Sequence, residues 1–122
     1  MWELIHSKSY DIMGPKEFTH RTRVPGGWLV KHISFDGVSI PSPNALSFFP
    51  DSEGLWKVEE GKQKWELVHN KSGVNFAEKT FRLSVPGGWL VRAGYFVGER
   101  LSMAMTYLPD DNHEWTVDDK TK

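Results

Sequence analysis

The chain has 122 residues, of which 39% are hydrophobic and 13% aromatic, and six are tryptophan. This composition predicts a folded globular protein, and the longest apolar runs are too short to span a membrane. The formal net charge of −1 argues against a general DNA or RNA binder, and the absence of cysteine excludes disulfides and thiol catalysis. We expect a cytoplasmic protein, because the N-terminus shows no signal peptide.

The predicted elements are β-strands, and no window keeps the 3.6-residue period of a helix. In chain order, the first four strands are predicted at Trp2–Ser7, Phe18–Val24, Trp28–Phe35 and Ala45–Phe49. A polar connector then runs over residues 56–64, after a predicted loop at residues 40–44. The last four strands are predicted at Trp65–Asn70, Thr80–Val85, Trp89–Phe96 and Ser102–Leu108. The terminal residues 118–122 are predicted to fray.

The second four strands repeat the first four, so the chain is an internal duplication. Residues 2–9, 24–31 and 45–51 return as residues 65–72, 85–92 and 104–110, and the six tryptophans form three matched pairs. The copies span residues 1–60 and 61–122, and they join near residues 59–64.

The two copies are expected to share a core. A unit of about 60 residues buries only about 60% of the surface of its unfolded chain and would be marginally stable alone. The sequence therefore predicts an all-β protein of two tandem four-stranded antiparallel units, packed as a pseudo-twofold sandwich or barrel. The pattern does not choose between these two packings.

The hairpin around each Pro-Gly-Gly turn is the first candidate site. With a three-residue loop at residues 25–27, Arg21 lies opposite Lys31, and in the second copy Arg82 lies opposite Arg92. Like charges across a strand pair cost up to about 1 kcal/mol, so each pair can be interpreted as holding an anion such as phosphate. The alternative is that these long side chains splay apart into water.

Trp28 and Trp89 open a strand just after this turn, where an indole could stack on a nucleotide base. The alternative is that they fill the core of a small β protein, which is also the expected role of the other four tryptophans.

The remaining candidates favour structural roles. His6 and His69 recur at one place in each copy, but two histidines do not make a metal site, and no cofactor is expected. Asp51 and Asp110 each follow a proline in matched turns, where aspartate commonly hydrogen-bonds its own backbone. As paired carboxylates they could also do acid–base chemistry. No nucleophile–base pair supports a catalytic site, so a non-enzymatic protein is expected.

The string Val-Pro-Gly-Gly-Trp-Leu-Val-Arg at residues 85–92, followed by a strand and a Pro-Asp turn ending in His-Glu-Trp, resembles small uncharacterised proteins of bacteriophages and prophages. The match covers residues 80–115 best and residues 19–56 more loosely. It implies a phage accessory protein in the bacterial cytoplasm, of a kind that often blunts host defence, one class by sequestering nucleotide second messengers. The resemblance brings no catalytic residues with it.

Three alternative hypotheses about the function follow from these observations. The first is a binding protein for a small anionic, nucleotide-like ligand, in which Arg21, Lys31, Arg82 and Arg92 hold phosphates and Trp28 and Trp89 stack on bases. The second is a protein-interaction module that inhibits a bacterial protein. The third, a hydrolytic enzyme, would need turnover that depends on His69 or Asp110. The expected partners are a small anionic ligand and, as alternatives, a host protein or the chain itself in a homo-oligomer.

Overall fold

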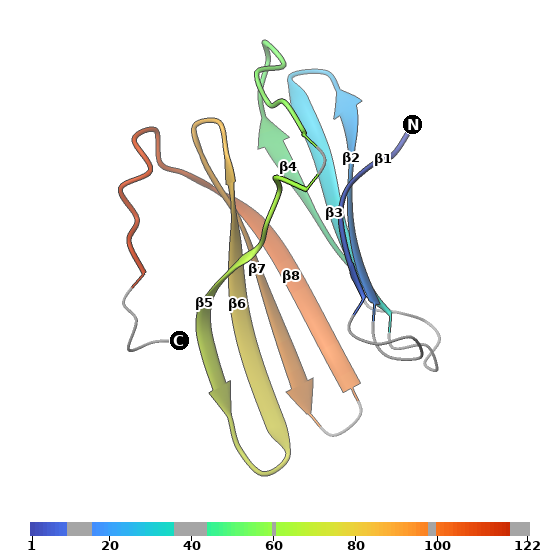
Figure 1. Cartoon of the computed structure of the whole chain (residues 1–122), viewed down its shortest axis with the longest axis vertical. Coiled ribbons are helices and arrows are strands. Elements are labelled where there is room, and N and C mark those ends of the chain that lie inside the picture. The colour runs from blue at the N-terminus through green and yellow to red at the C-terminus, as the bar shows by residue number, and fades with distance from the viewer. Residues whose placement is uncertain (10–15, 36–43, 60, 98–99, 118–122) are drawn as a thin grey trace.

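A computed structural model of the chain describes residues 1–9, 16–35, 44–59, 61–97 and 100–117. Within these residues the protein is all-β, and all eight predicted strands are confirmed (Figure 1). They are β1 (Glu3–Ser9), β2 (Lys16–Val24), β3 (Gly27–Phe35), β4 (Asn44–Pro50), β5 (Glu66–Ser72), β6 (Phe76–Val85), β7 (Gly88–Val97) and β8 (Arg100–Pro109).

The strands form two antiparallel sheets, each made by one copy of the repeat. Sheet A has the order β1-β2-β3-β4 and sheet B the order β5-β6-β7-β8, and neither closes into a barrel. The first strand of each sheet carries a β-bulge at the same place, between Leu4 and His6 and between Leu67 and His69. The duplication in the sequence is therefore a duplication of the fold.

Each sheet has a covered face, on which the segment after its last strand packs. Residues 51–58 lie on the face of sheet A that carries Arg21 and Val30, and residues 110–117 lie on the face of sheet B that carries Arg82 and Val91. We call these residues the first and second covering segments. The other side of each sheet is its opposite face, which carries the strand residues of the other parity.

The core lies between the two sheets and is built from both copies. Sheet A contributes residues of its covered face, and sheet B contributes residues of its opposite face. The fully or nearly buried members are Ile5, Val30, Phe49, Trp56, Leu83, Val85 and Leu90.

The two copies therefore pack front to back. Val30 is fully buried, whereas its counterpart Val91 is not, and the reverse holds for Leu90 and its counterpart Leu29. The sandwich of two units is as predicted, but a twofold axis would have brought equivalent faces together. Apolar residues on both faces of the repeat allow the front-to-back packing instead.

The predicted register of the Pro-Gly-Gly hairpins is wrong by one residue. Val24 pairs with Gly27, so the loop has two residues, and Arg21 lies opposite Val30 rather than Lys31. Pro25 followed by Gly26, whose φ is +83°, is the sequence that a type II turn requires.

The same shift occurs in the second copy. Arg82 pairs with Val91 and Arg92 with Phe81, so the two arginines lie on different faces of sheet B. The like-charge pairs that motivated the anion hypothesis do not form.

Residues 40–43 of the loop predicted at residues 40–44 lie outside the described residues, as does the predicted frayed end at residues 118–122, whereas Asn44 begins β4. No helix among the described residues could cross a membrane, since these residues form strands, turns and irregular segments.

Candidate functional site

Arg21 and Arg82 make equivalent contacts in the two copies, and these contacts hold each covering segment on its sheet. The Arg21 Nε donates to Glu3 Oε1 at 2.7 Å, its Nη1 donates to the Trp56 carbonyl oxygen at 2.7 Å, and its guanidinium lies 3.9 Å from the centre of the Trp28 ring. Arg82 makes the corresponding contacts with Glu66, Trp115 and Trp89. Each arginine ties a covering segment to its sheet.

The aspartates of the Pro-Asp turns also hold the covering segments on their sheets. Asp51 Oδ2 accepts hydrogen bonds from the Trp28 indole at 2.8 Å and the Trp56 amide at 2.9 Å, and Oδ1 accepts one from the Leu55 amide. Burial raises the pKa of the Asp51 carboxyl, but these hydrogen bonds and Arg23 hold it below its ordinary value.

Asp110 binds Trp89, Trp115 and the Glu114 amide in the same way. The predicted backbone hydrogen bonds of both aspartates are therefore present.

The predicted site residues do not come together. Trp28 and Trp89 are held by an arginine and an aspartate, and their positions match the core alternative. Lys31 lies on the opposite face of sheet A, next to Trp2 and paired with His20. Of the six predicted residues, Arg92 is the one that lines the pocket between the sheets.

A buried polar cluster surrounds Arg92. The Glu17 carboxylate lies 3.4 Å from Arg92 Nη2 and 3.5 Å from His6 Nε2, and it is only 10% exposed. His32 Nε2 lies 3.9 Å from Glu17 Oε2. Burying charges is costly unless they are paired, and in this cluster the buried Arg92 and Glu17 pair with each other.

His32 is held as a neutral imidazole in this cluster. The Trp65 indole donates to Thr19 Oγ1 at 2.9 Å, and this hydroxyl lies 2.7 Å from His32 Nδ1. Complete burial, and then the charge of Arg92, lower the pKa of His32 to about 3. The second ring nitrogen of His32, Nε2, faces the Glu17 carboxylate.

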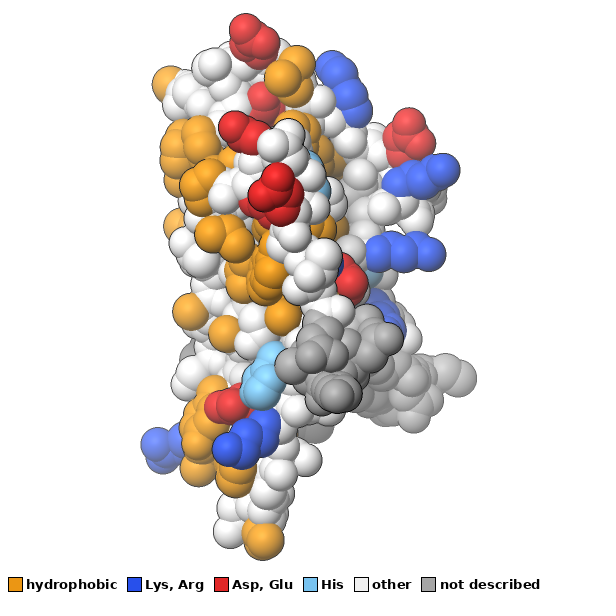
Figure 2. Space-filling view, turned by 90° about the vertical axis from the view of Figure 1, so that its left-hand side faces the viewer, with side chains coloured by type: hydrophobic (Ala, Val, Ile, Leu, Met, Phe, Trp, Pro, Cys, Tyr) orange, Lys and Arg blue, Asp and Glu red, His pale blue; other side chains and the backbone are white. Residues whose placement is uncertain are grey.

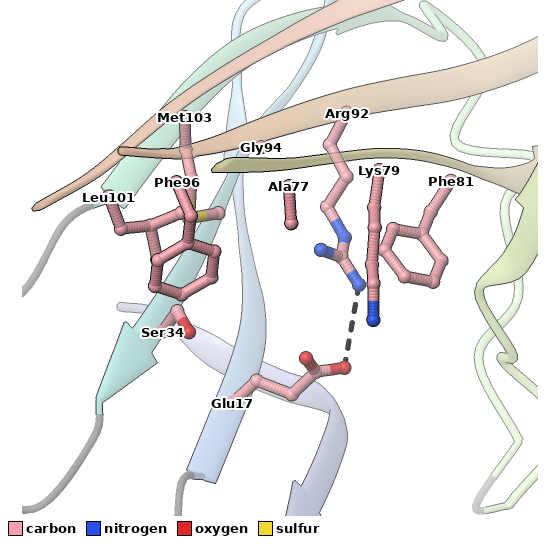
Figure 3. Close-up of a pocket in the computed structure, with 10 residues that line it drawn as sticks. All are labelled: Glu17, Ser34, Ala77, Lys79, Phe81, Arg92, Gly94, Phe96, Leu101 and Met103. Atoms are coloured by element: carbon pink, nitrogen blue, oxygen red, sulfur yellow. Dashed lines mark hydrogen bonds and ion pairs between the residues drawn. The ribbon is translucent and has the colours of Figure 1, made fainter. Parts of the chain in front are cut away.

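The pocket opens beside this cluster and has a volume of about 270 Å³. Figure 3 shows Phe96, Leu101 and Met103 on one side, and Arg92, Lys79 and Phe81 on the other. Glu17 and Ser34 face them from sheet A. Apolar walls with a few converging polar groups are typical of small-molecule sites.

Sequence reasoning missed most of this pocket. Glu17 and Thr19 lie on either side of Phe18 on β2, and on a single sheet this pattern predicts that the two polar residues face solvent. The weak available signal was the divergence of His32 and His20 from their counterparts Ala93 and Phe81. The two copies differ where one copy meets the other.

The described residues contain no group of three or more histidine or carboxylate side chains placed to hold a metal ion. Comparisons with protein-family models, with curated proteins and with solved structures found no match. The fold and site define a two-unit β-sandwich with a pocket between its sheets.

Proposed function

We propose that the protein is a non-enzymatic binding protein for a small anionic ligand that carries a flat apolar group. The observation that carries this proposal is the pocket between the sheets, in which Arg92 and Lys79 stand beside a mainly apolar wall (Figure 3). Of the six residues predicted to bind the ligand, Arg92 is the one that this proposal keeps.

The charges beside the pocket suit an anion. Arg92 and Lys79 carry two positive charges, Glu17 carries one negative charge, and His32 is neutral at pH 7 because its pKa is lowered to about 3. A guanidinium presents a rigid fork that matches a carboxylate or phosphate. Phe96 and Met103 supply apolar contact for a ring.

The volume limits the size of the ligand. About 270 Å³ lies just below the usual range for small-molecule sites, which is about 300–1,000 Å³. A mononucleotide or a smaller aromatic anion fits this limit better than a dinucleotide.

Isothermal titration tests the proposal, with benzoate, purine mononucleotides, their cyclic forms and cyclic dinucleotides as probes. Arg92→Lys is expected to weaken binding about tenfold, because an ammonium keeps the charge but loses the fork. Lys79→Met is expected to weaken it by a smaller factor, while Lys71→Met, outside the pocket, leaves it unchanged. The proposal fails if no probe gives heat, or if neither pocket variant weakens binding.

A second candidate function is protein interaction through the opposite face of sheet A. Four large apolar side chains are exposed there: Trp2 at 37%, Leu4 at 51%, Leu46 at 56% and Phe48 at 46%. Apolar side chains gathered on one sheet face are typical of an interaction surface. The inhibition of a host-defence protein, implied by the phage resemblance, stays a prediction.

A further inference from the structure

We propose that the opposite face of sheet A binds the covered face of sheet B in a second copy of the chain, in the same front-to-back manner in which the two copies of the repeat pack within one molecule. The proposal deepens the second candidate function and does not depend on the pocket ligand.

The internal interface shows what covers an opposite face. In sheet B this face packs on the covered face of sheet A through three principal contacts. Phe49 and Tyr107 lie 5.1 Å apart between ring centres, Trp65 donates to Thr19, and Arg92 pairs with Glu17.

Each of these contacts has an unused counterpart on the two outer faces. By the offsets of the duplication, Arg92, Trp65 and Tyr107 correspond to Lys31, Trp2 and Phe48 on the opposite face of sheet A. Glu17, Thr19 and Phe49 correspond to Glu78, Thr80 and Leu108 on the covered face of sheet B. One molecule thus carries both halves of a second interface like its internal one.

The cationic half of this second interface is already assembled. Lys31 Nζ lies 4.3 Å from the centre of the Trp2 ring, as the Arg92 guanidinium lies 4.7 Å from that of Trp65. In sheet B the pair is packed against Glu17 and Thr19, whereas in sheet A Trp2 is exposed. An equivalent cation–aromatic pair is therefore present on the opposite face of each sheet, and only the pair on sheet B is covered.

The acceptor half is assembled as well. His69 Nε2 lies 3.3 Å from Glu78 Oε1, matching the pair of His6 and Glu17. The Glu78 side chain is 40% exposed, whereas that of Glu17 is 10% exposed. What buries Glu17 is the second copy of the repeat, and Glu78 lacks such a cover in the single chain.

A hollow of about 350 Å³ lies beside Glu78 and Thr80 on sheet B. Ala93 lines it at the position where sheet A has the imidazole of His32, which contacts the Trp65 ring at 5.6 Å between ring centres. The space left by the smaller side chain can take the indole of Trp2 from the second molecule.

The charges of the two faces are complementary. The opposite face of sheet A carries Lys16, His20 and Lys31, and the described strand residues of that face include no carboxylate. The side of sheet B with the second covering segment carries the carboxylates of Glu66, Glu78, Asp111 and Glu114, which outnumber the basic strand residues of that face, Lys71, Arg82 and Arg100. Figure 2, seen from the side where this segment lies in Figure 1, shows hydrophobic side chains along the height of the molecule and acidic ones mostly in its upper half.

The available area is sufficient for a specific contact. The strands of sheet A have seven or nine residues and are about 23–30 Å long, and four strands span about 19 Å. Each partner then contributes roughly 500 Å², so the total is about the 1,000 Å² that separates specific contacts from incidental ones. Because the two faces differ, the contact is heterologous and each added molecule offers a new free face.

Sedimentation velocity from low micromolar to millimolar concentration tests this inference. We expect the wild-type chain to form a concentration-dependent series of species. Phe48→Asp blocks one face and Leu108→Asp the other, so each variant alone is expected to be monomeric. Val74→Asp, at an exposed residue of the β5–β6 turn, is the matched control and is expected to assemble like the wild type.

Mixing the two blocked variants distinguishes this arrangement from a twofold dimer. The intact sheet A face of Leu108→Asp can bind the intact sheet B face of Phe48→Asp, which gives one dimer that cannot grow. If Phe48→Asp is misfolded by circular dichroism, Lys31→Glu replaces it.

A monomeric wild-type chain at every concentration overturns the inference, and so does a mixture that forms no dimer. If the monomer instead retains another protein through Phe48, the second candidate function stands and the identity of the partner is wrong.

Discussion

His32 is the side chain whose chemistry depends most on the contact between the two copies. Its imidazole is fully buried between Thr19, Glu17 and the Trp65 ring. Burial first, and Arg92 next, lower its pKa from 6.5 to about 3, so the folded protein keeps it neutral where the unfolded chain binds a proton.

The pH dependence of stability follows from this difference. Between pH 6.5 and about 3 the unfolded state holds more protons, so the free energy of unfolding falls as the pH falls, at up to about 1.4 kcal/mol per pH unit. Urea unfolding at about pH 7 and about pH 4.5 is expected to show this loss. His32→Gln should flatten the profile, while His69→Gln, at a side chain that is 44% exposed, should not.

Of the other groups whose pKa is lowered, Asp51 acts in a different pH window and His20 in an overlapping one. The pKa of Asp51 is lowered from 3.8, so the stability it contributes is lost only below that value. The pKa of His20 is lowered by burial and by Lys31, which acts in the same direction as His32, but His20 is less buried. An unchanged profile in His32→Gln would show that His32 is not the cause.

At the scale of the element, the two glycines of each hairpin have different structural roles. Gly26 has a φ of +83° and open space around it, so it serves the turn. A Cβ on Gly27 would lie 2.1 Å from the Phe49 carbonyl oxygen, so Gly27 serves the close approach of β4.

The two substitutions to alanine should therefore differ in cost. Gly26→Ala is expected to cost about 1–2 kcal/mol, the strain of a left-handed residue. Gly27→Ala should cost at least about 3 kcal/mol, because β4 must move. Chemical denaturation of both variants provides the comparison, and equal costs would contradict the division of roles.

This division also explains how far the sequence could predict the site. Strand positions and the turn followed from the Pro-Gly-Gly motif, since proline and glycine restrict the local backbone. The register did not follow, because Gly27 looks like a turn residue until β4 is placed beside it. The shift of one residue then moved Lys31 and Arg92 to the other faces of their sheets.

At the scale of the whole molecule, the repeat predicted two units but not which faces meet. The equivalent residues Val30 and Val91 have the same side chain, and only the second copy decides that Val30 is buried. The pocket arises at this contact, from Glu17 of one unit and Arg92 of the other. A pattern within one repeat cannot reveal a site that needs both.

The shared core also predicts that the two units unfold together. Val30 and Leu90, both fully buried, come from different copies and belong to one apolar cluster. Far-UV circular dichroism and tryptophan fluorescence should therefore report a single coincident transition. Leu90→Ala should lower the free energy of unfolding by about 2–5 kcal/mol. Val30→Ala should lower it by less, and both variants should still unfold in a single transition. If either variant instead splits the unfolding into two steps, one unit folds without the other, and the buried cluster is less important to stability than its position between the sheets indicates.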